Sequence, residues 1–181
     1  METYIRKYHN ILGQSNCNAL IRMFDGLEHK HIKRDNEHYN FSELNFNELS
    51  DFNKGFVGGI YGILEEMVEK YIKDCNMMDK QFPLQYSFED FRFKKYNKGE
   101  GFFNEHVDVG NHNSAKRFLV CMFYLNTVEE GGETEFSKQD FISKAEIDSL
   151  IMFPSTWTHP HSGNKPLSND KYILSTYLHY V

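Results

Sequence analysis

Two histidines and an aspartate have the types and the spacing to bind a metal ion. His106 and Asp108 are separated by one residue, and in an extended strand such positions project from the same face. The apolar run 149–154 predicts a buried strand ending at a proline, and the turn after it would deliver His159 or His161. Two imidazoles and one carboxylate on one face of an octahedral ferrous ion leave the opposite face open for chemistry.

A lysine downstream adds an anion-binding group. Lys171 opens the run 171–178, which is rich in β-branched and aromatic residues and therefore predicts a strand. Lys171, Ile173, Ser175 and Tyr177 would share one face of it. A lysine that faces the interior is unfavourable unless it is paired, and a bound carboxylate is a natural partner. The sequence thus predicts one site for both a metal and an anion.

Five separated segments, within roughly residues 88–180, carry a resemblance to a known family. In their order they resemble the iron(II)- and 2-oxoglutarate-dependent dioxygenases of the prolyl 4-hydroxylase type. The segments are Tyr96–Asp108, Phe123–Asn126, Gly131–Phe136, Phe153–Ser155, and His161 with Lys171 and Tyr172.

The resemblance implies a role for each ligand position. It makes His106, Asp108 and His161 the iron ligands. His161 is preferred to His159 because the ten-residue step to Lys171, and the glycine two residues after His161, resemble the family's His-x-Gly segment.

The same resemblance implies a co-substrate pocket. Lys171 would bind the distal carboxylate of 2-oxoglutarate, and Tyr124 would hydrogen-bond the same carboxylate. Tyr96 would line the pocket near the metal, and Ser175 would supply a small hydroxyl beside Lys171. Gly131 and Gly132 would form the turn before the next strand, since glycine adopts backbone angles closed to other residues.

By this resemblance the protein would use Fe(II), 2-oxoglutarate and O2, with ascorbate as a further candidate. It would hydroxylate an unactivated C–H bond, preferably of a prolyl residue in a protein or peptide, and release succinate and CO2. Related halogenases lack the carboxylate, so Asp108 favours hydroxylation. Alternatives are the same chemistry on a free amino acid, small metabolite or alkylated nucleobase, a non-catalytic cupin-like metal-binding module, and a zinc hydrolase.

Composition limits the class of protein. At 181 residues the chain suits one domain, 1–181, with helical support and a substrate loop in 1–83 and a catalytic β core in 84–181. A net charge of −6 disfavours nucleic acid, and Lys94, Lys95 and Lys98 are interpreted as solvated protection of a strand edge. Three widely spaced cysteines predict reduced packing residues in a cytoplasmic protein. No apolar run indicates secretion or membrane insertion, and nothing indicates an oligomeric state.

The patterns predict an α+β, mainly β fold. Closely spaced strands with Gly and Asn turns indicate a double-stranded β-helix, a cupin-like jelly roll, and the resemblance puts the N-terminal helices on its major sheet. The resemblance implies that a polar loop, 31–50, frames the substrate entrance, and this loop and the segment 109–116 are expected to choose the substrate. The expected helices are 15–31, capped by Ser15 or Asn16, and 51–75. The expected strands are 4–12, 84–96, 103–108, 117–127, 133–136, 149–153 and 172–180, with a short strand in 137–147.

Overall fold

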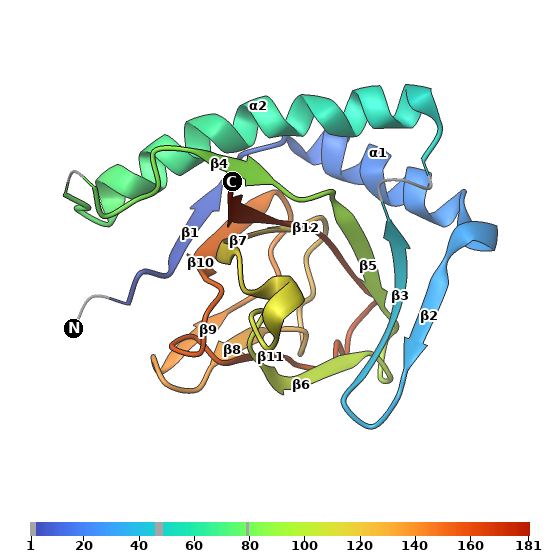
Figure 1. The fold of residues 1–181 in the computed structure, drawn as a ribbon. Coiled ribbons are helices and arrows are strands. Elements are labelled where there is room, and N and C mark those ends of the chain that lie inside the picture. The colour runs from blue at the N-terminus through green and yellow to red at the C-terminus, as the bar shows by residue number, and fades with distance from the viewer. Residues whose placement is uncertain (1–2, 46–48, 79) are drawn as a thin grey trace.

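A curled antiparallel sheet, crossed on one side by two long helices, makes up the fold (Figure 1). The computed structural model describes residues 3–45, 49–78 and 80–181. Among these residues, 12 strands join into one sheet in the order β1-β10-β7-β12-β5-β3-β6-β11-β8-β9, with β2 on β3 and β4 on β12. The helices are α1 (Gln14–Asp25) and α2 (Asp51–Asp74), with short 3-10 turns η1 (Glu28–Lys30) and η3 (His112–Ser114).

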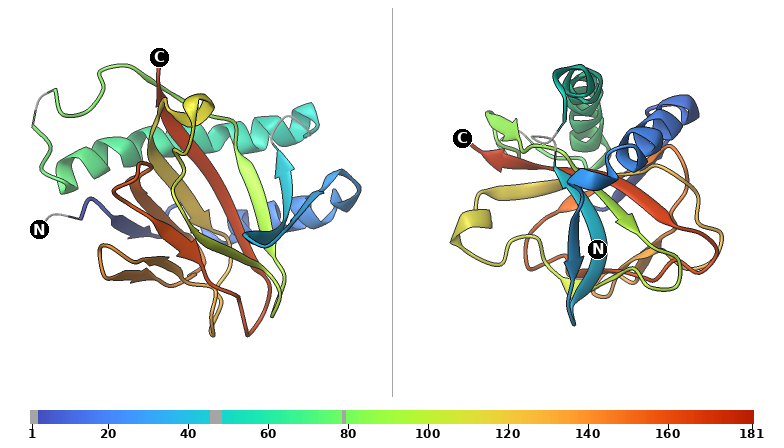
Figure 2. Two further views of the ribbon diagram at one scale, coloured as in Figure 1. Left: turned by 60° about the horizontal axis from the view of Figure 1, so that its bottom comes forward. Right: turned by 90° about the vertical axis from the view of Figure 1, so that its right-hand side faces the viewer.

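The strands close around an interior that holds the predicted site. Their bounds are β1 (Arg6–His9), β2 (Ile32–Asp35), β3 (Tyr39–Asn45), β4 (Tyr86–Phe88), β5 (Arg92–Tyr96), β6 (Phe102–His106), β7 (Arg117–Tyr124), β8 (Thr134–Phe136), β9 (Phe141–Ser143), β10 (Ser149–Pro154), β11 (His161–Gly163) and β12 (Lys171–Tyr180). The views in Figure 2 show the helices on one side of this barrel and the β2–β3 hairpin standing beside it. The predicted double-stranded β-helix is confirmed.

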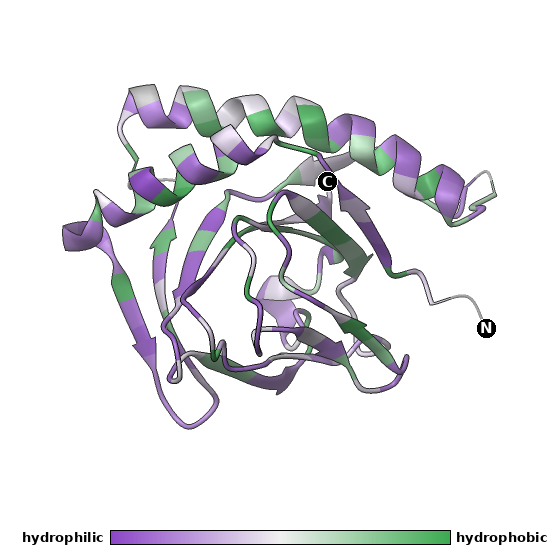
Figure 3. Cartoon of the chain, turned by 180° about the vertical axis from the view of Figure 1, so that it is seen from behind, coloured by the Kyte–Doolittle hydropathy of each residue, from purple (hydrophilic) through white to green (hydrophobic). Residues whose placement is uncertain are grey.

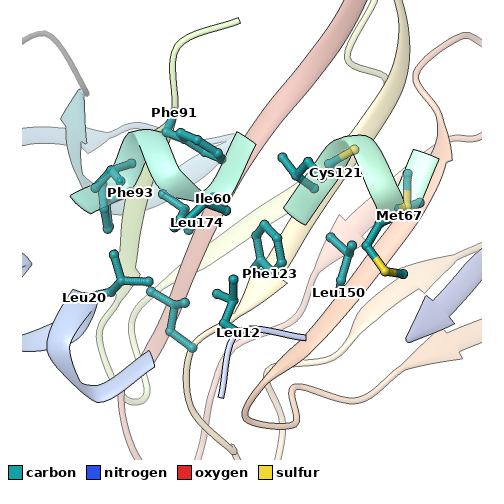
Figure 4. Packing of buried hydrophobic residues seen from close by; sticks show 14 of the residues in the cluster. Leu12, Leu20, Ile60, Met67, Phe91, Phe93, Cys121, Phe123, Leu150 and Leu174 are labelled. Atoms are coloured by element: carbon teal, nitrogen blue, oxygen red, sulfur yellow. The ribbon is translucent and has the colours of Figure 1, made fainter. Parts of the chain in front are cut away.

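The central strands send alternate side chains to two separate cores, because successive residues of a strand point to opposite faces. On β7, Cys121 and Phe123 pack toward the helices (Figure 4), and Leu119 belongs to the same cluster. Val120 and Met122 belong to the barrel interior. Burying a leucine or phenylalanine side chain contributes about 1.5–3 kcal/mol, so the helix–sheet layer supplies much of the stability. The prediction that the helices cover the major sheet is confirmed.

The two helices begin in different ways. Ser50 caps α2, since its side chain accepts a hydrogen bond from the backbone N–H of Asn53. The expected cap of α1 at Ser15 or Asn16 is wrong: the N-cap is Gly13, and the side chain of Asp148 accepts from the backbone N–H of Gly13 and of its two preceding residues. A carboxylate remote in sequence thus holds the segment that leads into α1. Both helices alternate apolar and polar residues along their length (Figure 3), and neither of these described helices could span a bilayer.

The expected polar loop 31–50 is instead a hairpin, β2–β3, with residues 46–48 outside the described residues. β3 pairs with both β5 and β6 and so connects the two halves of the sheet. Alternate residues of β3, Phe41 and Glu43, point into the barrel and are buried. The many polar residues of this segment hid that alternating pattern in the sequence. The expected strand 84–96 is likewise divided into β4 and β5. Cys17, Cys75 and Cys121 are buried, as predicted for packing residues.

Candidate active site

Three side chains from two strands and one turn meet in the barrel interior. One ligand atom from each of His106, Asp108 and His161 lies within 4.8 Å of the other two. His106 ends β6 and His161 begins β11, and these two residues are direct partners in the antiparallel ladder. Asp108 lies just beyond the end of β6, so the expected strand 103–108 extends two residues too far. The three groups nevertheless converge as the spacing predicts.

Backbone carbonyls fix which nitrogen of each imidazole faces the centre. Nδ1 of His106 lies 2.8 Å from the carbonyl oxygen of Asn104, and Nδ1 of His161 lies 3.1 Å from that of His159. A carbonyl oxygen can only accept, so both Nδ1 atoms carry the proton and both Nε2 atoms keep a free lone pair. Burial and the neighbouring imidazole of His161 lower the pKa of His106 to about 4, so His106 is neutral near pH 7. Both rings are ready to coordinate a cation.

The carboxylate of Asp108 is held by one oxygen and free at the other. Oδ1 accepts a hydrogen bond of 2.7 Å from the hydroxyl of Tyr177. Oδ2 is buried, has no hydrogen-bond partner among the described residues, and lies 3.6 Å from Nε2 of His161. A buried carboxylate oxygen without a donor is unfavourable unless a cation satisfies it. The residues present therefore fit a divalent metal bound by two histidines and one aspartate.

Further contacts hold the turn that carries Asp108. Nη1 of Arg117 donates to the backbone carbonyl of Asp108 at 3.3 Å, and the same guanidinium binds Glu89 through two bonds of 2.6 and 2.8 Å. The guanidinium also lies 4.1 Å from the ring centroid of Tyr177. Arg117, which the sequence pattern did not single out, thus orders both Asp108 and the tyrosine that hydrogen-bonds it.

His159 is excluded as a ligand by its own hydrogen bonds. Its Nε2 donates to the carbonyl oxygen of Thr3 at 2.7 Å, and its Nδ1 accepts from the hydroxyl of Thr158 at 2.8 Å. Only 6% of its surface is exposed, so His159 is a buried residue whose two ring nitrogens are both engaged. His159 instead supports His161 through its backbone carbonyl.

Lys171 lies at another wall of the same cavity. It begins β12, is 2% exposed, and its ammonium nitrogen is 5.4 Å from the ring centroids of both Tyr96 and Tyr124. Among the described residues it forms no ion pair or hydrogen bond, and burial lowers its pKa to about 7 although Glu133 acts in the opposite direction. An unpaired ammonium in a cavity is suited to an anionic ligand.

The remaining predicted residues surround Lys171 in different ways. Tyr96 and Ser175 line the cavity that contains the three ligand residues. Tyr124 is fully buried, burial raises its pKa to about 12, and its hydroxyl donates at 2.8 Å to Thr134, which does line the cavity. Tyr124 is therefore linked to the cavity through the hydroxyl group of Thr134, a residue that the sequence pattern did not assign to the site.

The turn at Gly131 and Gly132 is confirmed. Both have positive φ, and a Cβ at Gly131 would lie 2.2 Å from the carbonyl oxygen of Lys165. The turn lets β8 begin at Thr134.

Lys94 also faces this cavity, so its interpretation as solvated edge protection is wrong. It lies two residues before Tyr96 on β5, and the period of two that places Tyr96 inside places Lys94 there too. Burial lowers the pKa of Lys94, while Glu43 and Asp108 act in the opposite direction. By contrast Lys95 points the other way and pairs with Asp170 at 3.1 Å.

Known proteins resemble this chain in sequence pattern and in fold. The family model described as the 2OG-Fe(II) oxygenase superfamily matches residues 91–179. A search of curated proteins gave no match. A viral collagen prolyl hydroxylase from Paramecium bursaria Chlorella virus-1, solved with 2OG, is 21% identical with a TM-score of 0.72, over 99% of this chain and 97% of that one.

Two further structures are similar over nearly the whole chain. A prolyl-4-hydroxylase of Pseudomonas putida is 15% identical with a TM-score of 0.70, over 99% of this chain and 94% of that one. A prolyl hydroxylase of Trichoplax adhaerens, solved with a peptide fragment of the hypoxia inducible factor oxygen degradation domain, is 16% identical with a TM-score of 0.74, over 98% and 84%. At these identities the likeness concerns the fold.

Proposed function

Because this chain belongs to the 2OG-Fe(II) oxygenase superfamily, we propose that it hydroxylates a prolyl residue of a protein or peptide. One observation carries the oxygenase chemistry: the His106, Asp108 and His161 ligand set shares its cavity with the unpaired ammonium of Lys171. The choice of a prolyl substrate is supported by the prolyl hydroxylases among the structurally similar proteins.

In this proposal each ligand residue contributes one atom to Fe(II): Nε2 of His106, Nε2 of His161 and Oδ2 of Asp108. Fe(II), 2-oxoglutarate and O2 supply C–H hydroxylation coupled to release of succinate and CO2. The protein's part is to orient the reactants and to keep out water. Tyr177 keeps Oδ2 of Asp108 turned inward by holding Oδ1.

Lys171 binds the distal carboxylate of 2-oxoglutarate in the proposed complex. Its ammonium lies deep enough to act without competing water, and the rings of Tyr96 and Tyr124 limit where it can move. A charge-assisted contact of this kind is stronger than a neutral hydrogen bond. Ser175, at 4% exposed, lines the same cavity and offers a hydroxyl group.

The test begins under anaerobic conditions. Adding iron(II) and 2-oxoglutarate to the purified protein should produce a visible charge-transfer band, and Asp108→Ala should remove it. A panel of proline-containing peptides is then exposed to air, with and without ascorbate, and a gain of sixteen mass units is sought by mass spectrometry. A band without oxidation of any peptide contradicts the prolyl assignment and favours a small-molecule substrate. Absence of the band contradicts the oxygenase assignment itself.

A further inference from the structure

A second ammonium group faces the cavity close to the metal ligands. Nζ of Lys94 lies 4.8 Å from the ring centroid of Phe41 and 5.5 Å from that of Phe103. Phe103 in turn stacks on the ring of His106, with 3.5 Å between centroids and 9° between planes. The side chain of Lys94 is thus held over two phenyl rings beside one of the ligands.

Two carboxylates act on the charge of Lys94, those of Asp108 and Glu43. Asp108 belongs to the proposed metal site, where its Oδ1 accepts from Tyr177, and it forms no ion pair with Lys94. Glu43 lies opposite Lys94 in the ladder but binds Arg34 at 3.2 Å. Glu89 binds Arg117 at 2.6 Å, and Arg92 at 3.0 Å. Within the part of the chain that the structure describes, no carboxylate comes within 4.0 Å of Nζ of Lys94, and no hydrogen bond from this group is found. The two phenyl faces attract the ammonium but do not neutralise its charge.

The strand register separates Lys94 from the proposed 2-oxoglutarate anchor. Lys171 is the partner of Tyr96 on β5, whereas Lys94 is the partner of Ile173. Two residues of a strand span about 7 Å, so Lys94 on β5 lies about 7 Å from the level of Lys171, in the direction of Tyr177. The hydroxyl of Tyr177 donates to Asp108. 2-Oxoglutarate has two carboxylates, one for the metal and one for Lys171. Lys94 is left for a third.

We propose that Lys94 binds a carboxylate of the primary substrate, so that the preferred substrate carries an acidic group next to the carbon that is oxidised. This inference rests on the proposed function and names the substrate class within it. Recognition by a partly buried lysine selects by charge, since replacing the carboxylate with an amide leaves the ammonium without its counter-ion. Either an acidic residue beside the target residue or the free carboxylate of an amino acid has this chemistry.

The experiment compares probes that differ only in this charge. The pairs are Ac-Gly-Glu-Pro-Gly-NH2 with Ac-Gly-Gln-Pro-Gly-NH2, Ac-Gly-Pro-Glu-Gly-NH2 with Ac-Gly-Pro-Gln-Gly-NH2, and L-proline with L-prolinamide. Binding is measured by calorimetry on the Zn(II)- and 2-oxoglutarate-loaded protein, and succinate release is measured on the Fe(II) protein. The variants are Lys94→Gln, Lys94→Arg, which keeps the charge, and Lys95→Gln, a matched control on the opposite face of β5.

At least one acidic probe should bind about tenfold more tightly than its amide partner. Lys94→Gln should abolish this preference without changing the KM for 2-oxoglutarate, Lys94→Arg should retain part of it, and Lys95→Gln should retain it fully. The inference is overturned if no acidic probe is preferred, if Lys94→Gln keeps the preference, or if its effect is on 2-oxoglutarate instead. Release of succinate by the wild-type protein in those cases would leave the proposed oxygenase intact, so the two failures are distinguishable.

Discussion

The hydroxyl of Tyr177 donates a hydrogen bond of 2.7 Å to Oδ1 of Asp108 and leaves Oδ2 as the inward-facing oxygen. Tyr177 shares the inner face of β12 with Lys171, and the guanidinium of Arg117 lies over its ring. Strand β12 therefore supplies both the ammonium group of Lys171 and, further along, the hydroxyl of Tyr177 that orients the carboxylate of Asp108.

Removing this hydroxyl should weaken metal binding without removing a ligand. Loss of a hydrogen bond to a ligating carboxylate typically lowers metal affinity 10- to 100-fold, so we expect Tyr177→Phe to lower Fe(II) affinity by about tenfold or more. Anaerobic titration with Fe(II) measures the effect. Tyr180→Phe, at a site that is 53% exposed, is the control. Equal affinities in Tyr177→Phe and wild type would show that the hydrogen bond does not tune the carboxylate.

The two downstream histidines should respond differently to substitution. His161→Ala removes an atom of the ligand cluster, and we expect it to lower Fe(II) affinity by at least about 100-fold. His159→Ala keeps the cluster and loses the bonds to Thr3 and Thr158, so it should retain iron but unfold at a lower denaturant concentration. Iron content after anaerobic gel filtration and a denaturation curve separate the two effects. Loss of iron in His159→Ala alone would reverse the assignment.

Lys171→Ala should act on 2-oxoglutarate rather than on the metal. A charge-assisted contact of about 1.5–3 kcal/mol corresponds to a KM for 2-oxoglutarate raised roughly 10- to 100-fold. Fe(II) affinity measured without 2-oxoglutarate should stay within about twofold of wild type. Lys98→Ala, in an exposed turn, is the control. An unchanged KM would remove Lys171 from the proposed binding site.

The same lysine should make stability depend on pH. Its pKa is about 7 in the folded chain, against about 10.4 for a lysine exposed to water, so between these values the unfolded chain holds more protons. The free energy of unfolding should therefore rise with pH from about 7 to 10, by at most about 1.4 kcal/mol per pH unit from this group. Urea denaturation at several pH values measures it. Lys171→Met should lack this part of the rise, and the same pH dependence in both proteins would contradict the assignment.

The segment Val109–Lys116, directly after Asp108, is expected to influence substrate choice. It carries η3, which a capping box between Asn111 and Ser114 holds in place. Exchanging this segment for its counterpart in the Pseudomonas putida prolyl-4-hydroxylase should alter the ranking of peptide substrates while 2-oxoglutarate turnover without peptide stays the same. If both quantities fall together, the segment only supports the fold.

The sequence by itself determined what depends on local geometry. The alternation from Lys171 to Tyr177 follows from the geometry of a strand, and the short step from His106 to Asp108 keeps these two side chains close together; both features recur in the structure. The sequence also predicted α2, because its apolar residues recur with the period of a helix and form one face that packs on the sheet.

Only the tertiary structure decided what depends on residues far apart in the chain. The choice of His161 over His159 follows from the pairing of His161 with His106 and from the contact of His159 with Thr3. Asp148 holds the segment that leads into α1, and β3 becomes the strand that connects both halves of the sheet. Whether Lys94 is paired or free depends on which cations its neighbouring carboxylates bind, and only the packing of several strands fixes those pairs.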